Sequence, residues 1–197
     1  MKPMDINKPH LIIMVGIPGS GKSFFAEQFA ETFKAPIVSI NKLSQELFNF
    51  PISSTEEEVV HKIADQMLSE ILKTGKTIIY EGYTSLRADR MLISKKAKDN
   101  HYEPLFIWVQ TEQLTAKKRA TKTSDDKYTL NSEQFDNKIR RFSVPHKSEK
   151  VIVISGKHTY LSQLKIVLKH LARPATAIET SLNTAARPPI KRNYLIR

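Results

Sequence analysis

A glycine-rich octapeptide near the N-terminus constrains this chain more than any other feature. Residues 16–23 read GIPGSGKS, a complete match to the G-x-x-x-x-G-K-S phosphate-binding pattern. The glycines allow backbone conformations that a side chain would forbid, so successive amide groups can point at one phosphate. An apolar run leads into the octapeptide, and an amphipathic segment follows it whose helical N-terminus would attract the same anion. The pattern predicts a nucleotide-binding loop formed by Gly16, Ile17, Pro18, Gly19, Ser20, Gly21, Lys22 and Ser23.

Two side chains of this octapeptide carry specific chemistry. In loops of this kind the lysine bridges the β- and γ-phosphates, and the final hydroxyl binds Mg²⁺. We therefore assign the first role to Lys22, as a catalytic residue, and the second to Ser23.

Short apolar runs rich in β-branched residues alternate with amphipathic segments along most of the chain. Continuous apolar runs are typical of strands that helices cover on both faces, and the alternation is typical of a parallel sheet. The predicted strands are Leu11–Val15, Pro36–Ile40, Thr77–Glu81, Leu105–Gln110 and Val151–Ile154. The predicted helices are Lys22–Phe33, Thr55–Lys73, Ser85–Lys98, Glu112–Thr123, Asn131–Phe142 and Thr159–Leu171. We predict an α/β fold with a doubly wound, parallel, five-stranded sheet.

The segment Thr55–Lys73 carries the clearest helix signals. Ser54 can cap its start, and Glu57 three residues later would complete a capping box. Gly75 follows its end, as is usual for a helix stop. Its apolar stripe, which recurs every four residues, is predicted to face the core: Val59, Ile63, Met67 and Ile71.

A carboxylate follows the third predicted strand. Thr77 to Tyr80 form an apolar run, and Glu81 stands at its carboxyl end. Ligands of open α/β sheets bind at that edge, and phosphoryl transfer needs a carboxylate near the metal ion. We predict that Glu81 helps to hold Mg²⁺ or orients water there; the alternative is an ordinary strand-end charge that faces solvent.

The composition limits the remaining functions. There are 31 Lys and Arg against 20 Asp and Glu, a formal charge of +11, which favours anionic ligands without choosing among nucleotides, phosphorylated metabolites and nucleic acid. There is no cysteine, which excludes disulfides, thiolate metal sites and cysteine nucleophiles. No apolar run approaches the roughly 20 residues of a membrane-spanning helix. We expect a cytoplasmic protein with no membrane partner.

The composition changes after Leu171. The last 26 residues contain three prolines and five Lys or Arg against one Glu, and they lack apolar periodicity until the final few positions. We predict one nucleotide-binding domain over residues 1–171 and a basic, extended or disordered tail over residues 172–197.

The octapeptide GIPGSGKS and the segment GKTIIYEGYTSLRADR together resemble the small P-loop kinases grouped with phage polynucleotide kinase, zeta-toxin-type kinases and kinase-like AAA-family ATPases. The resemblance covers roughly residues 10–171. It implies an adenylate-kinase-like P-loop NTPase with strand order 2-3-1-4-5, and ATP as the nucleotide. Glu81 matches the family's acidic position, which is usually Asp. Arg90 falls where the following helix often carries Arg, which suggests a place at the acceptor site.

The segment after the fourth predicted strand resembles the family's lid, which would cover about residues 111–145. A lid arginine in such kinases stabilises the charge of the transferring phosphoryl group. Arg119 is the best match for this catalytic role, and Lys122 is the second as a nucleotide-binding residue. The alternative is that the lysines and arginine of this segment form a solvated helix face.

The chain departs from the family after the second predicted strand. The family usually reads Asp-x-x-Arg there, with the Asp as base for the acceptor hydroxyl. Here Asn41 takes the place of the Asp and Ser44 that of the Arg. An amide cannot accept the proton, so Asn41 could orient an acceptor without deprotonating it. Tyr83, next to the predicted site, could stack on a base or sugar or could simply pack.

Three functions follow from these features. The first is a kinase that uses ATP and Mg²⁺ to phosphorylate an unidentified small molecule or a nucleic-acid 5′-hydroxyl. The second is an ATP-binding switch or slow ATPase that acts through a protein partner. The third is a nucleic-acid-binding protein that uses its basic surface. We expect the first, acting as a monomer.

Overall fold

The computed structural model describes residues 8–48, 52–122, 129–146 and 148–171. Within these residues five strands form one parallel sheet in the order β2-β3-β1-β4-β5. The strands are β1 (His10–Val15), β2 (Ile37–Ser39), β3 (Ile78–Glu81), β4 (Glu103–Gln110) and β5 (Val151–Ser155). The predicted fold class and strand order are both confirmed.

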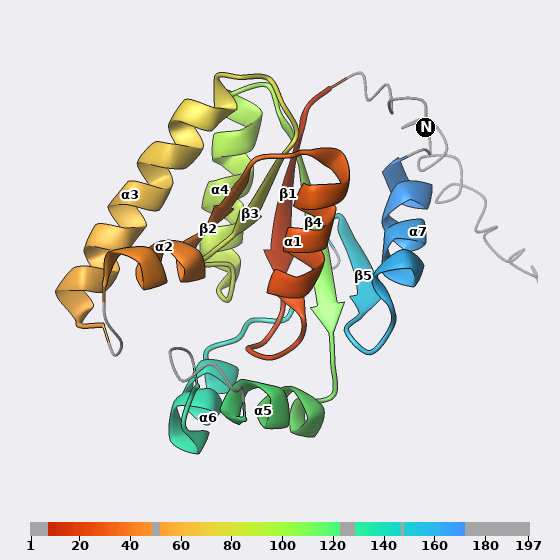
Figure 1. Cartoon of the computed structure of the whole chain (residues 1–197). Helices are drawn as coiled ribbons and strands as arrows, with labels where there is room; N and C mark the ends of the chain where they lie inside the picture. The colour runs from red at the N-terminus through yellow and green to blue at the C-terminus, as the bar shows by residue number, and fades with distance from the viewer. Residues whose placement is uncertain (1–7, 49–51, 123–128, 147, 172–197) are drawn as a thin grey trace, which may run out of the picture.

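Helices surround the sheet (Figure 1). They are α1 (Lys22–Phe33), α2 (Ile40–Leu47), α3 (Ser54–Leu72), α4 (Arg87–Asp99), α5 (Gln113–Thr121), α6 (Ser132–Arg140) and α7 (Tyr160–Leu171). Figure 1 shows α5 and α6 apart from the others, below the end of the sheet where the arrowheads point. All strands are parallel, so this is the edge where their carboxyl ends meet.

The central strand β1 is buried on both faces, as its continuous apolar run predicts. Leu11, Ile13 and Val15 belong to a core cluster that includes residues of α3 and α4. The alternate residues Ile12 and Met14 belong to a second cluster with residues of α1 and α7. Helices therefore cover both faces, and the carboxyl edge is left for the loops.

Helix α2 was not predicted. The sequence pattern placed residues 36–40 in a strand, but β2 ends at Ser39 and α2 begins at the next residue. The physical reason is a cap, because the Ser39 side chain accepts a hydrogen bond from the backbone N–H of Lys42. Asn41 consequently lies in the first turn of a helix and not in a loop.

Helix α3 begins one residue earlier than predicted, and its cap differs. The capping box is formed by Ser53 and Glu56, and not by Ser54 and Glu57. The fully buried stripe is also shifted by one residue, because a spacing of four fits either of two neighbouring rows. The buried row consists of Val60, Ala64, Leu68 and Leu72, whereas Val59 is 39% exposed.

The other predicted helices end within two residues of the observed bounds, and α1 matches at both ends. Thr123, the predicted end of the first lid helix, and the predicted tail over residues 172–197 lie outside the described residues. Among the described residues, no helix has the length and apolar character that crossing a membrane requires.

Candidate active site

The phosphate-binding loop joins β1 to α1 at the carboxyl edge of the sheet. Gly21 takes a left-handed conformation (φ 103°) immediately before α1, so the positive end of that helix adjoins the loop. Gly19 also has a positive φ (71°), and a Cβ atom there would lie 2.1 Å from the carbonyl oxygen of Ala116 in α5. Only glycine permits both this conformation and this close approach. The loop has the glycine-dependent turns and the helix N-terminus of a phosphate site.

The Lys22 ammonium is held inside this loop. Its Nζ donates a hydrogen bond to the carbonyl oxygen of Ile17 at 2.9 Å. Desolvation lowers the pKa of Lys22 from 10.5 to about 8; the Glu81 carboxylate opposes this shift, and the charge of Lys138 adds to it. A phosphate beside the ammonium would favour the charged form again. The ammonium is therefore buried at the loop, where a bound anion would offset its desolvation.

The carboxylate of Glu81 links two serines from different parts of the chain. Ser23 Oγ donates to Glu81 Oε1 in a short hydrogen bond, and Ser39 Oγ donates to Glu81 Oε2 at 3.0 Å. Ser39 and Glu81 are direct partners in the β2–β3 register, which brings the two side chains together at the ends of their strands. Glu81 is only 3% exposed, so these hydrogen bonds offset the cost of burying its charge.

These oxygens suit magnesium. Mg²⁺ prefers carboxylate, hydroxyl and phosphate oxygens, and it usually takes one or two protein ligands while water and phosphate supply the others. Ser23 Oγ and Glu81 Oε1 are adjacent at the loop, as such a site requires. Among the described residues there is no group of three or more His, Cys, Asp or Glu that could hold a metal ion. The hydroxyl of Ser23 and the carboxylate of Glu81 are therefore the groups at the loop that fit Mg²⁺.

Helices α5 and α6 form a unit that rests on the loop. Phe135 of α6 is completely buried in a small cluster with Ala116 and Ala120 of α5, and Ile17 of the loop packs against this cluster. Lys117 of α5 also forms an ion pair of 2.8 Å with Asp136 of α6. Both helices fall within residues 111–145, the segment for which the family resemblance predicts a lid.

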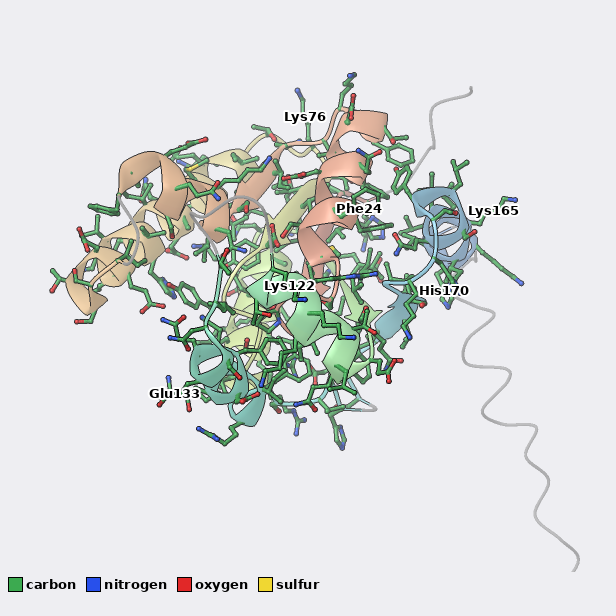
Figure 2. All side chains as sticks on the ribbon, turned by 60° about the horizontal axis from the view of Figure 1, so that its bottom comes forward. Phe24, Lys76, Lys122, Glu133, Lys165 and His170 are labelled. Carbon is green, nitrogen blue, oxygen red and sulfur yellow. The ribbon has the colours of Figure 1, made fainter. Side chains whose placement is uncertain are left out.

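The two predicted lid cations lie in different surroundings. Arg119 Nη1 donates to the carbonyl oxygen of Gly156 at 2.9 Å, in the turn that follows β5. This turn touches the loop, because a Cβ atom on Gly156 would lie 1.9 Å from the carbonyl oxygen of Ser20. Lys122 is exposed at the end of α5, where Figure 2 labels it. The structure thus places Arg119 beside the loop and leaves Lys122 in solvent.

A third cation, Lys138 of α6, was missed by the sequence interpretation. Its charge is close enough to contribute to the lowered pKa of Lys22. It stands three residues after the buried Phe135, which places both on the same side of α6. The sequence spacing could have shown that Lys138 shares a helix face with Phe135. It could not show that this face points to the loop, because the element that packs against α6 is not known from sequence.

The predicted acceptor residue Asn41 is exposed in the first turn of α2. Ser44, which stands at the family's Arg position, is buried and donates its hydroxyl hydrogen to the carbonyl oxygen of Ile40 at 2.9 Å. Ser44 therefore satisfies its own helix and does not replace an arginine that would face an acceptor. Sequence reasoning could not have distinguished these two uses of a small hydroxyl.

Tyr83 lies against the start of α3. Its hydroxyl donates to Glu57 Oε1 at 3.0 Å, and its ring stacks on His61 with 4.8 Å between the ring centroids and 15° between the planes. Burial, and then the hydrogen bond to the Glu57 carboxylate, raise the pKa of Tyr83 above its usual value. Both contacts are made with α3, so the structure shows Tyr83 packed against this helix.

Arg90, the other predicted acceptor residue, is completely buried. It forms an ion pair with Glu149 through Nε (2.6 Å) and Nη2 (3.1 Å). Its Nη1 donates to three backbone carbonyl oxygens, those of Thr84, Ser85 and Ser143. This geometry gives Arg90 a structural role, in which it joins the turn after β3 to the segment before β5, and it does not bring the guanidinium to an acceptor.

A cavity of about 460 Å³ borders the loop at the carboxyl ends of β4 and β5. It is lined by Ile17, Trp108, Val109, Gln110, Thr111, Glu112, Phe142, Ser155 and Lys157. The ion pair between Lys157 and Glu112, at 2.9 Å, belongs to its wall. Its volume is in the range of small-molecule sites.

A comparison with protein families matches residues 11–145 to a model described as an AAA domain. This span includes the loop, Glu81, Arg119 and Lys138, and it ends before β5.

Comparisons with solved structures show the same fold in several kinases and nucleotide-binding proteins. A gluconokinase from Sinorhizobium meliloti 1021 matches with a TM-score of 0.62 and 16% identity, over 88% of this chain and 97% of that one. Chaetomium thermophilum Kti12, solved in complex with ADP-AlF3, matches with a TM-score of 0.56 and 14% identity, over 83% of this chain and 100% of that one. A chain of the Pnkp1/Rnl/Hen1 complex matches with a TM-score of 0.52 and 22% identity, over 68% of this chain and 46% of that one.

Proposed function

The chain belongs to the AAA-domain family, and on that premise we propose that it is a small P-loop kinase that transfers the γ-phosphate of ATP to an acceptor hydroxyl. The acceptor is a small molecule or the 5′-hydroxyl of a nucleic acid. We expect the protein to act as a monomer in the cytoplasm, where ATP is available.

One observation carries this proposal. The loop serine is hydrogen-bonded to a buried carboxylate at the end of the neighbouring strand, while a two-helix lid rests on the same loop. Phosphoryl transfer depends on positioning and charge stabilisation, and these are the parts it uses. A loop that only bound phosphate would need neither the carboxylate nor the cations on the lid.

The side chains divide the work of transfer among them. Lys22, which now donates to the Ile17 carbonyl, would donate to the phosphates of a bound nucleotide. Ser23 and Glu81 would hold Mg²⁺, which neutralises phosphate charge when it is bound. Arg119, which is bonded to the turn beside the loop, and Lys138, whose charge acts on Lys22, would stabilise the charge that moves with the phosphoryl group.

The ATP preference is supported by Kti12, whose structure contains ADP-AlF3. The acceptor class is supported by the neighbours in the same way: one is a gluconokinase, and another belongs to a complex that includes Pnkp1. Since these proteins are distant in sequence, the acceptor of this chain has to be found by experiment.

The residues at the start of α2, where the family resemblance predicts the acceptor site, favour a second function. Asn41 cannot remove a proton, and Ser44 is turned into its own helix. Loss of a general base costs about 10²–10⁴-fold in rate where proton removal matters. A protein with this defect could bind ATP, hydrolyse it slowly and signal its nucleotide state to a partner protein.

Incubation with γ-labelled ATP separates these functions. The full-length protein is mixed with pooled metabolites and, separately, with 5′-hydroxyl oligonucleotides. The kinase proposal expects label in an acceptor, and it expects Lys22→Ala to abolish the transfer while Lys165→Ala, an exposed lysine of α7, leaves it unchanged. Label that leaves ATP only as free phosphate would refute the kinase and support the switch.

Asn41→Asp is the companion test, since it restores an acid at the exposed start of α2. If the chain is a kinase that lacks only its base, transfer should rise toward the factor of about 10² or more that a base supplies. No gain would show that another residue already removes the proton or that the acceptor does not need one.

A further inference from the structure

We infer that Ser39 is a positioning residue: it fixes the Glu81 carboxylate for the magnesium–nucleotide complex and links that carboxylate to helix α2. The inference rests on the proposed function, because it assumes that nucleotide and Mg²⁺ bind at the loop. Neither the family match nor the sequence pattern singles out this serine.

The first observation is the geometry around the carboxylate. Glu81 accepts one hydrogen bond at each oxygen, from Ser23 at Oε1 and from Ser39 at Oε2. Ser39 is itself buried, with 4% exposure, so water cannot easily replace its hydroxyl. Each oxygen of the carboxylate therefore has its own donor, one from α1 and one from β2.

The chemistry explains why the second donor matters. The Ser23 hydroxyl gives its hydrogen to Oε1, which leaves its lone pairs available to a cation. If Ser39 did not satisfy Oε2, the buried carboxylate would lack a partner at that oxygen and could rotate toward the loop. Groups that orient a metal-binding carboxylate in this way commonly change metal affinity by 10–100-fold when they are removed.

The second observation is that the Ser39 hydroxyl also contacts helix α2, where the family resemblance predicts the acceptor site. Ser39 Oγ accepts a hydrogen bond from the backbone N–H of Lys42 at 3.4 Å and so caps α2. The Lys42 ammonium in turn pairs with Glu27 Oε1 of α1 at 2.9 Å. Helix α2 carries Asn41, so the Ser39 hydroxyl touches both the Glu81 carboxylate and the helix that would face the acceptor.

The experiment titrates Mg²⁺ into the full-length protein with a fixed concentration of a non-hydrolysable ATP analogue and measures nucleotide affinity by calorimetry. Ser39→Ala should raise the Mg²⁺ concentration for half-maximal binding about 10-fold or more, and it should leave the weak affinity measured in EDTA nearly unchanged. Ser44→Ala is the matched control. It also removes a buried hydroxyl from the α2 region, but within the described part of the chain this hydroxyl bonds to the carbonyl of Ile40 and not to Glu81.

A structural role alone would lower stability in both variants without changing the dependence on Mg²⁺. If Ser39→Ala and Ser44→Ala respond alike to Mg²⁺, the inference is overturned. If the wild type itself shows no Mg²⁺-dependent nucleotide binding, the proposed function fails instead, so the two failures can be told apart.

Amide hydrogen exchange tests the link between the loop and α2 even if Ser39→Ala is less stable than the wild type. In the wild type, addition of Mg²⁺ and nucleotide should slow exchange of the first amides of α2, including that of Lys42. The slowing should be lost in Ser39→Ala and retained in Ser44→Ala. Equal slowing in all three proteins would show that α2 is not linked to the loop through Ser39.

Discussion

Binding of nucleotide at pH 8 should be accompanied by uptake of protons, and Lys22 is the reason. Its pKa is lowered from 10.5 to about 8 by desolvation, so close to half of the free protein carries a neutral lysine at pH 8. The phosphates of a bound nucleotide favour the charged ammonium and raise its pKa again. Each binding event then restores about half a proton to Lys22 at pH 8 and almost none at pH 6, because the group is already charged there.

Calorimetry in buffers that differ in ionisation enthalpy measures this uptake directly. Lys22→Arg keeps the positive charge but cannot deprotonate in this range, so uptake at pH 8 should disappear from that variant. Lys165→Ala should behave like the wild type, because Lys165 is exposed on α7. Equal uptake at pH 6 and pH 8, or persistence of the uptake in Lys22→Arg, would refute the assignment of the shifted pKa to this lysine.

The same shift predicts how stability depends on pH without nucleotide. Between pH 8 and 10.5 the unfolded chain binds more protons at Lys22 than the folded protein does, so this group makes stability rise with pH over that window. Below pH 8 the lysine is charged in both states, and the full cost of burying it, about 3 kcal/mol, is present. Urea unfolding should be measured for the wild type and Lys22→Ala at pH 7.5 and 10. The free energy of unfolding of the wild type should rise relative to that of Lys22→Ala at the higher pH. A constant difference would contradict the linkage.

Three further substitutions test other parts of the structure. Arg90→Ala should lower the free energy of unfolding by about 3–5 kcal/mol, because it leaves the buried carboxylate of Glu149 without its ion-pair partner. A loss below about 1 kcal/mol in urea denaturation would contradict the structural role. Gly19→Ala should cost more stability and nucleotide affinity than Gly75→Ala, since both glycines have positive φ but only the first faces a carbonyl oxygen; similar losses would mean that α5 does not press on the loop. Lys138→Ala should raise the pKa of the loop lysine and so reduce proton uptake at pH 8; unchanged uptake would place this cation away from the loop.

The expected direction at Glu149 follows from its surroundings. Burial by itself would raise its pKa, but hydrogen bonds from Arg90 and from the backbone N–H of His146 outweigh burial and lower it. A lowered carboxylate pKa stabilises the protein above the usual pKa and loses that contribution as pH falls through the folded value. The wild type should therefore lose more stability on acidification than Arg90→Ala does.

The sequence by itself determined the loop, because the chemistry of residues 16–23 is local: glycines, a lysine and a serine at fixed spacing need only the strand before them and the helix after them. It also predicted the sheet, since short continuous apolar runs are typical of strands that are buried on both faces. Helix α1 is found at the predicted bounds, and the strand order is the one that the family resemblance implies. A spacing of four residues was less informative in α3, where two adjacent rows fit it and only packing selects one.

Only the tertiary structure decided which polar groups meet. Ser39 reaches Glu81 across 42 positions of sequence because β2 and β3 pair in one particular register, and no local pattern encodes that register. Arg90 fits an acceptor role by its place in the sequence, yet the fold encloses it with Glu149, 59 positions away. Local residue types specify the shape of the backbone, whereas the electrostatics of a buried charge depend on partners that the finished fold brings to it.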